Sequence, residues 1–417
     1  MNNNEADTKP VIVAAQDRGE TLGLIEPMLV SASSRQRAAL TDIAINLAED
    51  SAGLRHSLPE GVLIALTDLV RSMNCYYSNL IEGHDTHPVD IERARNRDYS
   101  SDPNKRDLQI EAEAHIAVQE WIDAGSLKGR ATTLAGICEI HRRFTELLPE
   151  SLRWIEHLET GEKLEVIPGE LRKHDVSIGG HVAISPGALP RFLERFDDVY
   201  SNLGKTDAIL AAASAHHRLL WIHPFLDGNG RVSRLMSYAM LLETLDTRGL
   251  WSVARGLAHN VSDYKRHLAA CDQERRNDLD GRGHLSEEAL AGFTRFFLES
   301  CIDQIRFMRD LIQPDRLRNR IVIWAEEEIR ASNLLPKAEL VLEALLYRGQ
   351  LPRGEVANLT GTQERQARRI TKSLFDKKVL ASEGPRSPLR LAFPARLAGR
   401  WMPGVYPQQV LNFQDLA

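Results

Sequence analysis

The sequence predicts a mostly α-helical protein with one β-hairpin in its middle and a small winged helix-turn-helix unit near its C-terminus. Apolar residues recur at helical spacing through most of the chain, as at Leu40, Ile43 and Leu47. Between 165 and 185, β-forming residues alternate with polar ones around a Gly179-Gly180 pair, which is typical of a hairpin.

The helical segments have bounds that the sequence indicates. Helices are expected over 36–49, 57–82, 109–124, 133–148, 190–203, 207–222, 230–247, 260–273 and 287–311. Pro59 in the first turn and Gly83 just past the end delimit the second of these. Residues 1–35 carry chain breakers and little periodicity, so we expect an extended arm. Residues 86–109 are charged and turn-rich, which predicts a loop or a short helix.

The segment after Pro314 has a pattern of its own. Short helices are expected over 337–346, 353–359 and 363–377, and strands over 379–382 and 389–393. Three helices followed by a small β wing is the order of a winged helix-turn-helix unit.

Composition limits the class of protein. At 417 residues and 43% hydrophobic content, the chain can bury a sizeable core, which excludes global disorder. Its 52 Lys and Arg against 58 Asp and Glu give a net charge of −6, which argues against a surface built wholly for nucleic acid. Residues 336–400 differ, because 13 Lys and Arg oppose 6 Asp and Glu there, a charge of +7 that leaves −13 elsewhere.

The cysteines and the N-terminus indicate the compartment. Cys75, Cys138, Cys271 and Cys301 have neither disulfide-framework nor zinc-site spacing, so reduced structural thiols are expected. No basic start precedes an apolar run, and no apolar stretch approaches the roughly 18 residues of a membrane span. We therefore expect a cytoplasmic chain without a membrane segment.

One stretch, HPFLDGNGRVSR from His223 to Arg234, joins two apolar helices. Gly228 and Gly230 allow positive φ and close backbone approach, so successive N–H groups can face a bound anion. The next helix begins near Gly230, and its positive dipole end faces the same spot. Arg231 and Arg234 stand three apart on that helix and add paired positive charge.

Two more side chains of this stretch suit group transfer. Asp227 can place a carboxylate on Mg²⁺, which favours oxygen ligands and phosphate co-ligands. His223 offers a base near neutral pH. A Gly-x-Gly pair alone is weak evidence, and a histidine before proline is most often structural. Twelve residues that supply all of these groups together favour the diphosphate cradle, metal anchor and base of a phosphoryl or nucleotidyl transferase.

These twelve residues resemble the signature of the Fic (filamentation induced by cAMP) family, HPFx(D/E)GNGRxxR, at every fixed position. The resemblance spreads over about residues 60–310 and includes the helix AAASAHHRLLWI and the hairpin before it. Most members are adenylyltransferases that move AMP from ATP onto a protein hydroxyl. The resemblance therefore implies a Fic-type helical bundle with a β-hairpin flap, ATP as co-substrate and Mg²⁺.

The resemblance also implies roles for single residues. His223 would be the base that deprotonates a Tyr, Thr or Ser of the target protein, and Asp227 would hold Mg²⁺. Asn229 would hold the α-phosphate, and the backbone around Gly228 and Gly230 would form the anion hole. Arg231 would contact the β-phosphate side and Arg234 the γ-phosphate. Phe225 and Pro224 are expected to fix the loop.

Two further regions match the family less specifically. The hairpin resembles the family's flap, whose exposed edge would pair with an extended target segment; an ordinary surface hairpin is the alternative. Its residues are Ser177, Ile178, Gly179, Gly180, His181 and Val182. Asn260 and Tyr264 match a looser pattern that lines the nucleotide pocket, although an amphipathic helix needs such residues anyway.

A second signature lies upstream, at Ser78-Asn-Leu-Ile-Glu82-Gly83 near the end of a predicted helix. Ser78 and Glu82 are four apart and share a helix face. The segment resembles the Fic inhibitory motif, (S/T)xxxE(G/N), in which the glutamate pairs with the second arginine, here Arg234, and occupies the γ-phosphate position. The resemblance implies autoinhibition within the chain. In some relatives the same glutamate supports removal of AMP, and nothing in the sequence excludes this.

These observations divide the chain. We expect an arm and helical region over 1–110 with the inhibitory helix at about 57–83, and a Fic catalytic domain over 111–312. A connecting helix or linker over 313–335, the winged helix over 336–400 and a tail over 401–417 follow. A homodimer is common in similar proteins.

The C-terminal unit leaves two functions open. Its third helix carries Gln363, Arg365, Gln366, Arg368 and Arg369, and Arg and Gln are the usual readers of base edges. Winged helices also dock proteins and form dimers. The chain is thus either an autoinhibited adenylyltransferase whose unit selects targets, or a DNA-binding transcriptional regulator with the Fic domain as a nucleotide sensor. The intact His223 favours the first.

Overall fold

Helices α7 (Lys205–Ile222) and α8 (Asn229–Leu245) pack side by side at the centre of the molecule, and the predicted motif forms the loop between them. The computed structural model describes residues 16–156 and 161–407. Four consecutive small residues of α7, at 211–214, are almost wholly buried, which lets neighbouring helices approach closely. The helix is buried on nearly every side over 209–222, and it also buries the polar side chains Ser214, His216, His217 and Arg218.

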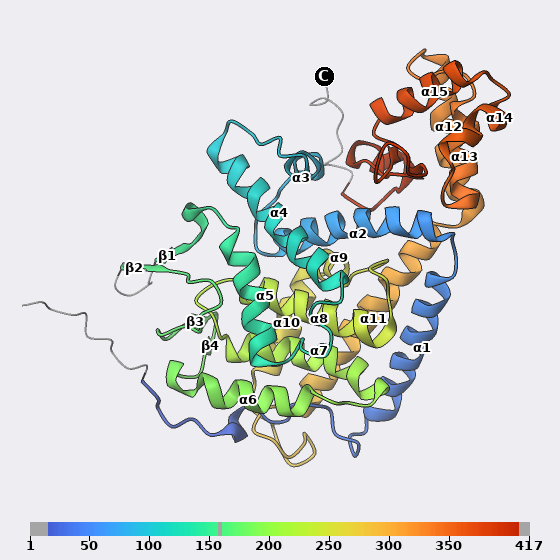
Figure 1. Ribbon diagram of the computed structural model, residues 1–417. Coiled ribbons are helices and arrows are strands. Elements are labelled where there is room, and N and C mark those ends of the chain that lie inside the picture. The colour runs from blue at the N-terminus through green and yellow to red at the C-terminus, as the bar shows by residue number, and fades with distance from the viewer. Residues whose placement is uncertain (1–15, 157–160, 408–417) are drawn as a thin grey trace, which may run out of the picture.

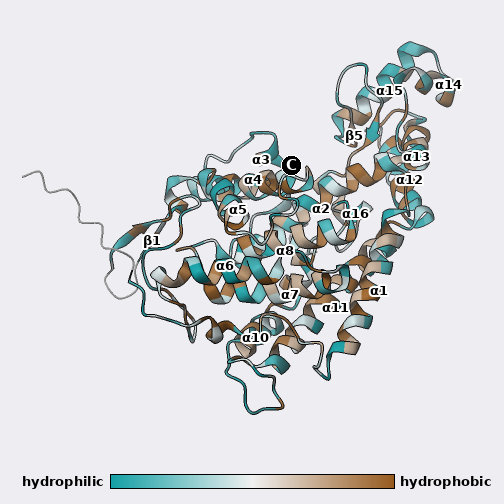
Figure 2. Ribbon diagram, turned by 60° about the horizontal axis from the view of Figure 1, so that its bottom comes forward, coloured by the Kyte–Doolittle hydropathy of each residue, from teal (hydrophilic) through white to brown (hydrophobic). Residues whose placement is uncertain are grey.

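The remaining helices surround this pair (Figure 1). They are α1 (Arg37–Arg55), α2 (Glu60–Ile81), α3 (Pro88–Arg95), α4 (Pro103–Asp123), α5 (Leu134–Glu146), α6 (Leu189–Tyr200), α9 (Ala254–His259), α10 (Val261–Cys271) and α11 (Glu287–Leu311). Several begin at the caps that their sequences provide: Asp102 and Thr133 accept from backbone N–H groups of α4 and α5, and Pro103 occupies the first turn of α4. Figure 2 shows the resulting polar and apolar faces on a surface helix such as α6.

The strands form small antiparallel pairs in the described part of the chain. β1 (Trp154–Glu156) pairs with β2 (Lys163–Glu165), which the sequence did not predict. β3 (Ser177–Ile178) pairs with β4 (His181–Val182) at the expected hairpin, in the register Ser177 to Val182 and Ile178 to His181. The mostly α-helical fold with a small hairpin is therefore confirmed.

The segment after α11 projects from one side of the helical body (Figure 1). It contains α12 (Pro314–Arg330), α13 (Ala338–Arg348), α14 (Val356–Thr360), α15 (Glu364–Asp376), the pair β5 (Leu380–Ala381) and β6 (Arg390–Leu391), and α16 (Ala398–Trp401). A backbone bridge from Leu351 to Leu389 extends the strand pair. The order of elements agrees with the expected one, and that the unit is a winged helix stays a prediction.

Helix α2 joins this segment to the body. Near its start, a Cβ at Gly61 would overlap the carbonyl of Gly349, just past α13, so the two backbones meet directly. Near its end, the buried ring of Tyr406 packs edge-on against Tyr76, with centroids 5.5 Å apart. The two contacts fix α2 at both ends.

The N-terminal arm crosses the body rather than leaving it. Glu20 accepts hydrogen bonds from the backbone N–H and the hydroxyl of Ser185, next to the hairpin, at 2.8 and 2.6 Å. Tyr200 donates to the carbonyl of Met28 at 2.6 Å. The expected arm is thus seated on α6 from residue 16 onward, and residues 1–15 lie outside the described residues.

Two helices differ from expectation. The charged stretch 86–109, expected as a loop or a short helix, contains the short helix α3, which His87 caps, but α4 already begins at Pro103, capped by Asp102, rather than at 109. A separate short helix, α9, precedes α10. None of the described helices combines the length and the apolar character needed to cross a bilayer.

Candidate active site

The loop from His223 to Gly228 reverses the chain between two buried helices. His223 ends α7 in the left-handed region at φ +50°, and Gly228 precedes α8 at φ +81°. A non-glycine residue at positive φ is uncommon, so the surrounding contacts must hold His223 in this conformation. The turn directs the N-terminus of α8 toward the segment that carries His223.

Two side chains hold the loop from inside. The Asn229 amide accepts from the backbone N–H of Phe225 at 3.0 Å and donates to its carbonyl at 2.8 Å. Phe225 is fully buried and stacks on His141, with centroids 3.9 Å apart and planes 2° apart. Asn229 therefore braces the loop in this structure, and its contact with an α-phosphate stays a prediction.

The protonation of His223 follows from its contacts. Its Nδ1 lies 3.2 Å from the carbonyl oxygen of Leu220, so Nδ1 carries the hydrogen and donates. Burial lowers the pKa of His223 to about 4. The ring is neutral at pH 7, and Nε2 bears a free lone pair, as a general base requires.

A buried arginine joins this loop to the hairpin. Arg172 donates from Nε to the carbonyl of His223 at 2.7 Å, and its backbone N–H donates to the carbonyl of Pro224 at 2.9 Å. The same guanidinium donates to the carbonyls of His174 and Ile184, one on each side of the hairpin, at 2.9 and 2.5 Å. Burial lowers the pKa of Arg172 to about 10, which leaves it charged at pH 7. It ties both ends of the hairpin to the backbone of the motif.

The first arginine of the motif, Arg231, is buried and faces a carboxylate. It forms an ion pair with Glu111, whose other oxygen lies 2.7 Å from Nδ1 of His84. Its second contact, from Nη2 to Asp227, is longer at 3.4 Å. Its Nε has no hydrogen-bond partner among the described residues. Arg231 thus keeps an unsatisfied donor in the site.

Asp227 is the most accessible carboxylate of the loop, with 46% of its side chain exposed. Partial burial of the carboxyl group raises the pKa of Asp227 above the ordinary value for an aspartate. Among the described residues, no cluster of three or more His, Cys, Asp or Glu could enclose a metal ion. A cation at Asp227 would take its other ligands from water or from oxygens of a bound molecule.

The second arginine, Arg234, is enclosed by the end of α2. Its Nε donates to the Ser78 hydroxyl at 2.9 Å, and its Nη2 donates to the Ser78 carbonyl at 3.1 Å and to Glu82 at 2.5 Å. Burial raises the pKa of Glu82, but the charges of Arg234 and Arg231 outweigh it and hold that pKa below its ordinary value. The residues of the two signatures, 152 positions apart, thus meet.

The glycine at 230 makes room for this contact. A Cβ there would overlap Oε1 of Glu82 and lie 3.2 Å from Nη1 of Arg234. The Glu82 carboxylate therefore lies against the first turn of α8, where a bound anion would be stabilised by the helix N-terminus.

The hairpin presents an exposed edge. Ile178 and Val182 are 41% and 66% exposed, although both are apolar. Gly179 adopts φ +59° in the two-residue turn, and Gly180 completes it. His181 turns inward, with Nε2 2.8 Å from the carbonyl of Trp221 near the end of α7.

Asn260 and Tyr264 differ in solvent exposure. Asn260 is exposed, and its amide donates to the carbonyl of Gly256 at 3.1 Å. Tyr264 is buried, and its hydroxyl lies 2.7 Å from Nε2 of His216. Burial raises the pKa of Tyr264, and the nearby positive charge of Arg234 partly offsets this rise. Their role at a nucleotide stays a prediction.

The sequence did not indicate Glu111, His84, His141 or Arg172. Glu111, His141 and Arg172 contact the motif from other parts of the chain, and His84, just past the Ser78–Gly83 signature, reaches it through Glu111. A polar residue among the apolar positions of α4, such as Glu111, was the one available signal, since a buried carboxylate needs a partner.

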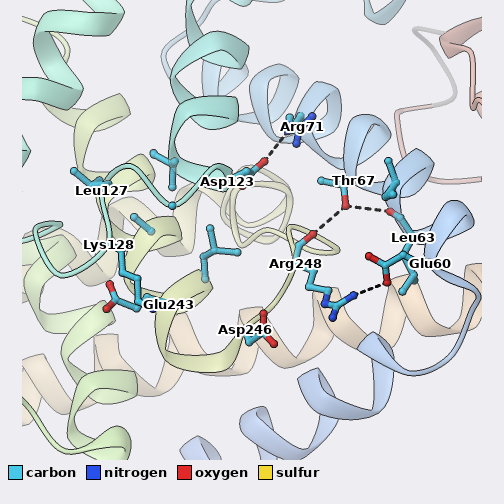
Figure 3. Close-up of a pocket in the computed structure, with 15 residues that line it drawn as sticks. Glu60, Leu63, Thr67, Arg71, Asp123, Leu127, Lys128, Glu243, Asp246 and Arg248 are labelled. Carbon is cyan, nitrogen blue, oxygen red and sulfur yellow. Dashed lines mark hydrogen bonds and ion pairs between the residues drawn. The ribbon is translucent and has the colours of Figure 1, made fainter. Parts of the chain in front are cut away.

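A separate hollow lies at the far end of α8 (Figure 3). It is lined by α2, by the turn after α4 and by the end of α8, and none of its fifteen lining residues belongs to the motif. Arg248 pairs with Glu60 at 2.6 Å there, and Thr67 donates to the Arg248 carbonyl at 2.9 Å. This hollow is distinct from the site around His223.

Residues 131–241, which contain α5, the hairpin, α7 and most of α8, match the family model described as Fic/DOC family. The chain contains a Fic/DOC domain. Over 125 residues it is 34% identical to two proteins named protein adenylyltransferase Fic, from Drosophila willistoni and Drosophila virilis. The aligned part is 30% of this chain but only 22% and 23% of those relatives.

A solved Fic family protein from Desulfovibrio desulfuricans is also similar, at 16% identity and a TM-score of 0.48, over 84% of this chain and 96% of that one. The Fic/DOC match ends at 241, so it includes His223, Asp227, Arg231 and Arg234. Ser78 and Glu82 precede it.

Proposed function

We propose that the chain is an autoinhibited protein adenylyltransferase, which moves AMP from ATP to a Tyr, Thr or Ser hydroxyl of a protein. One observation carries the proposal: a half-buried histidine, whose Nδ1 faces the carbonyl of Leu220, and the N-terminus of α8 lie at the two ends of the same tight loop. The relatives that share this domain are named protein adenylyltransferases, which supports the reaction class.

The nucleotide phosphates have suitable partners on α8. Three kinds of donor lie near Gly230. They are the unpartnered Nε of Arg231, the backbone N–H groups at the start of α8 and the guanidinium of Arg234. Backbone N–H and guanidinium groups of this kind stabilise phosphate oxygens through charge-assisted hydrogen bonds.

The chemical step uses Nε2 of His223. The target hydroxyl loses its proton to Nε2, and its oxygen forms a bond to the α-phosphorus of ATP. The bond from that phosphorus to the oxygen bridging to the β-phosphate breaks, and diphosphate leaves. The N–H groups at the start of α8 stabilise the added charge on the α-phosphate oxygens.

Mg²⁺ fits this site as a joint ligand of protein and nucleotide. Asp227 offers a half-exposed carboxylate whose ion pair with Arg231 is long, at 3.4 Å, and Mg²⁺ commonly binds one or two carboxylates together with phosphates. The ion would neutralise phosphate charge when bound. Asp227 itself would orient the nucleotide relative to His223.

The target segment would be held by the hairpin. Ile178 and Val182 give it exposed apolar side chains beside free strand edges, which suits addition of an extended peptide strand. Arg172 connects this hairpin to the carbonyl of His223, so target and base are held by one network.

Inhibition follows from competition for Arg234. Glu82 occupies the guanidinium and lies against Gly230, so a γ-phosphate and the carboxylate cannot share that position. A charge-assisted hydrogen bond contributes about 1.5–3 kcal/mol, which corresponds to roughly 10- to 100-fold in activity.

The experiment is transfer of label from α-³²P-ATP by the full chain, with a lysate or the chain itself as acceptor. Glu82→Gly should raise incorporation about 10- to 100-fold, and His223→Ala in that background should abolish it. Mass spectrometry of labelled peptides should find added AMP on a hydroxyl side chain.

A matched control separates inhibition from general loosening. Glu60→Gly removes an exposed glutamate at the other end of α2, where its partner is Arg248, and should leave incorporation unchanged. Equal activity of wild type and Glu82→Gly would disprove autoinhibition. Incorporation that survives His223→Ala would disprove the role of the base.

A further inference from the structure

The outer face of α15 is a strongly positive surface that the adenylyl transfer does not use. Arg365, Arg368, Arg369 and Lys372 are exposed on it, while Ala367, Ile370, Thr371 and Leu374 bury the opposite face in the unit. Both ribbon views show α15 near the end of the unit that is far from α6 and α7 (Figures 1 and 2).

Most, but not all, of the Lys and Arg side chains in residues 336–400 have a partner among the described residues. Six of the thirteen cations pair with carboxylates: Arg348, Arg368, Lys377, Lys378, Arg390 and Arg400. Three others, Lys337, Arg353 and Arg396, donate to backbone carbonyls. Within the described ranges this leaves Arg365, Arg369, Lys372 and Arg386 without an ion pair or a side-chain hydrogen bond.

The exposed cations of α15 share one helix face; Arg365, Arg369 and Lys372 are unpaired, and Arg368 pairs with Glu364 on the same face. Arg365 and Arg369 are four apart on α15, and so are Arg368 and Lys372, so the four form two parallel rows along one helix face. Arg386 is exposed in the loop between β5 and β6. Three unpaired cations of residues 336–400 therefore lie together on α15.

We propose that α15 binds duplex DNA, with its arginine rows against phosphates at the edges of the major groove. The major groove is about 12 Å wide and admits one α-helix, and phosphate contacts from Lys and Arg supply most of such binding.

A protein partner fits this face less well. Protein interfaces have apolar or aromatic residues at their centre and few lysines. The exposed positions of α15 are Glu364, Arg365, Arg368, Arg369, Lys372 and Asp376, all of them charged. The surface therefore offers charge complementarity to a polyanion and no apolar anchor.

The test is fluorescence anisotropy of the full chain with a fluorescein-labelled mixed-sequence duplex of roughly 25 base pairs, more than two helical turns. Binding should weaken log-linearly between about 50 and 200 mM salt. The triple variant Arg365→Ala, Arg369→Ala, Lys372→Ala should bind at least about tenfold more weakly, with a salt slope smaller by about 2 to 3.

The matched control removes three exposed cations from the body, Lys105→Ala, Arg106→Ala and Lys128→Ala. It should bind like wild type. All substituted side chains are exposed, so thermal unfolding of both variants should be unchanged. Equal weakening by both triples would overturn the proposal, as would tighter binding of a labelled poly-glutamate peptide or of single-stranded RNA than of the duplex.

Discussion

Glu82 and Arg234 form a hydrogen-bonded ion pair, 2.5 Å long, against the bare backbone of Gly230. The pair joins the end of α2 to the first turn of α8. Because the arginine is almost fully buried, the carboxylate replaces water as its partner, and any anion that binds there must displace it.

Ser78 strengthens this pair, which predicts a graded response. Ser78→Ala removes the hydroxyl that accepts from Nε of Arg234 but keeps the backbone carbonyl and Glu82. Activity in the AMP-transfer assay should rise to a level between wild type and Glu82→Gly, because Arg234 loses one hydrogen bond while Glu82 still occupies its guanidinium. Ser72→Ala, on the same helix and bonded only to a backbone carbonyl, is the control. An Ser78→Ala rate equal to wild type would contradict the role of the hydroxyl.

The pH profile should lack the usual histidine inflection. A base must be unprotonated, and burial lowers the pKa of His223 to about 4. In the Glu82→Gly protein, kcat/KM should stay level from pH 8 to about pH 5 and fall only as pH approaches 4. NMR titration of the His223 ring, assigned by comparison with His223→Ala, gives an independent value. An inflection near pH 6.5 in both would refute the tautomer and burial argument.

Arg172 should act on turnover. Arg172→Lys keeps the charge but cannot reach the carbonyls of His223, His174 and Ile184 together. In the Glu82→Gly background we expect kcat to fall by about tenfold, or 1.4 kcal/mol, and KM for ATP to stay constant. Lys173→Ala, on the exposed neighbour that pairs with Glu170, should leave both constants unchanged. A rise in KM for ATP alone would point to a different role.

Buried histidines should make the fold sensitive to acid. The pKa values of His115 and His216 are lowered to about 3, and those of His141, His217 and His223 to about 4, mainly by burial. Below about pH 6.5 the unfolded chain binds protons that the folded chain does not, so stability falls as pH falls, by up to about 1.4 kcal/mol per pH unit for each such group.

His115 offers a way to test this. Neither of its ring nitrogens has a hydrogen-bond partner among the described residues. In His115→Leu, the fall in melting temperature between pH 7 and pH 5 should be smaller than in wild type. His56→Leu, at an exposed position, should melt like wild type at both values. An unchanged fall in His115→Leu would show that this ring does not contribute.

The tail contact on α2 should support inhibition. Tyr406 is 1% exposed and packs on Tyr76, two residues before Ser78. Tyr406→Ala leaves a cavity beside α2 and should cost about 3–5 kcal/mol in unfolding free energy. It should also raise AMP transfer in the presence of Glu82, because the end of α2 is less firmly held. Tyr347→Ala, at a 56% exposed position, should do neither. A destabilised variant with wild-type activity would separate the tail from inhibition.

What the sequence could predict depends on how local the signal is. The helices, the hairpin turn at Gly179-Gly180 and the motif loop follow from periodicity, glycine and capping residues within a few positions. The pair β1 and β2 was missed because strands of three residues, rich in charge, show no alternation. α9 was missed because six residues give too little periodicity.

The same reasoning applies to the site. Residues 223–234 are contiguous, so their meeting needs no tertiary information, and the contact of Glu82 with Arg234 was expected only from family resemblance. The partners Glu111 of Arg231 and His141 of Phe225 come from other helices, and nothing in the sequence marks them as neighbours. Asn229 shows the converse, because its motif position was clear while its bonds to the Phe225 backbone were not.

The close approach of Gly61 and Gly349 has a consequence for how such chains can diverge. Neither position can gain a side chain while the backbones stay in contact. A Cβ at Gly61 would overlap the carbonyl of Gly349, and Gly349 itself adopts φ +76°, which favours glycine. Among descendants that keep the C-terminal unit in place, both positions should remain glycine together. Where the unit is lost, position 61 is released and can drift to the ordinary residues of a helix start.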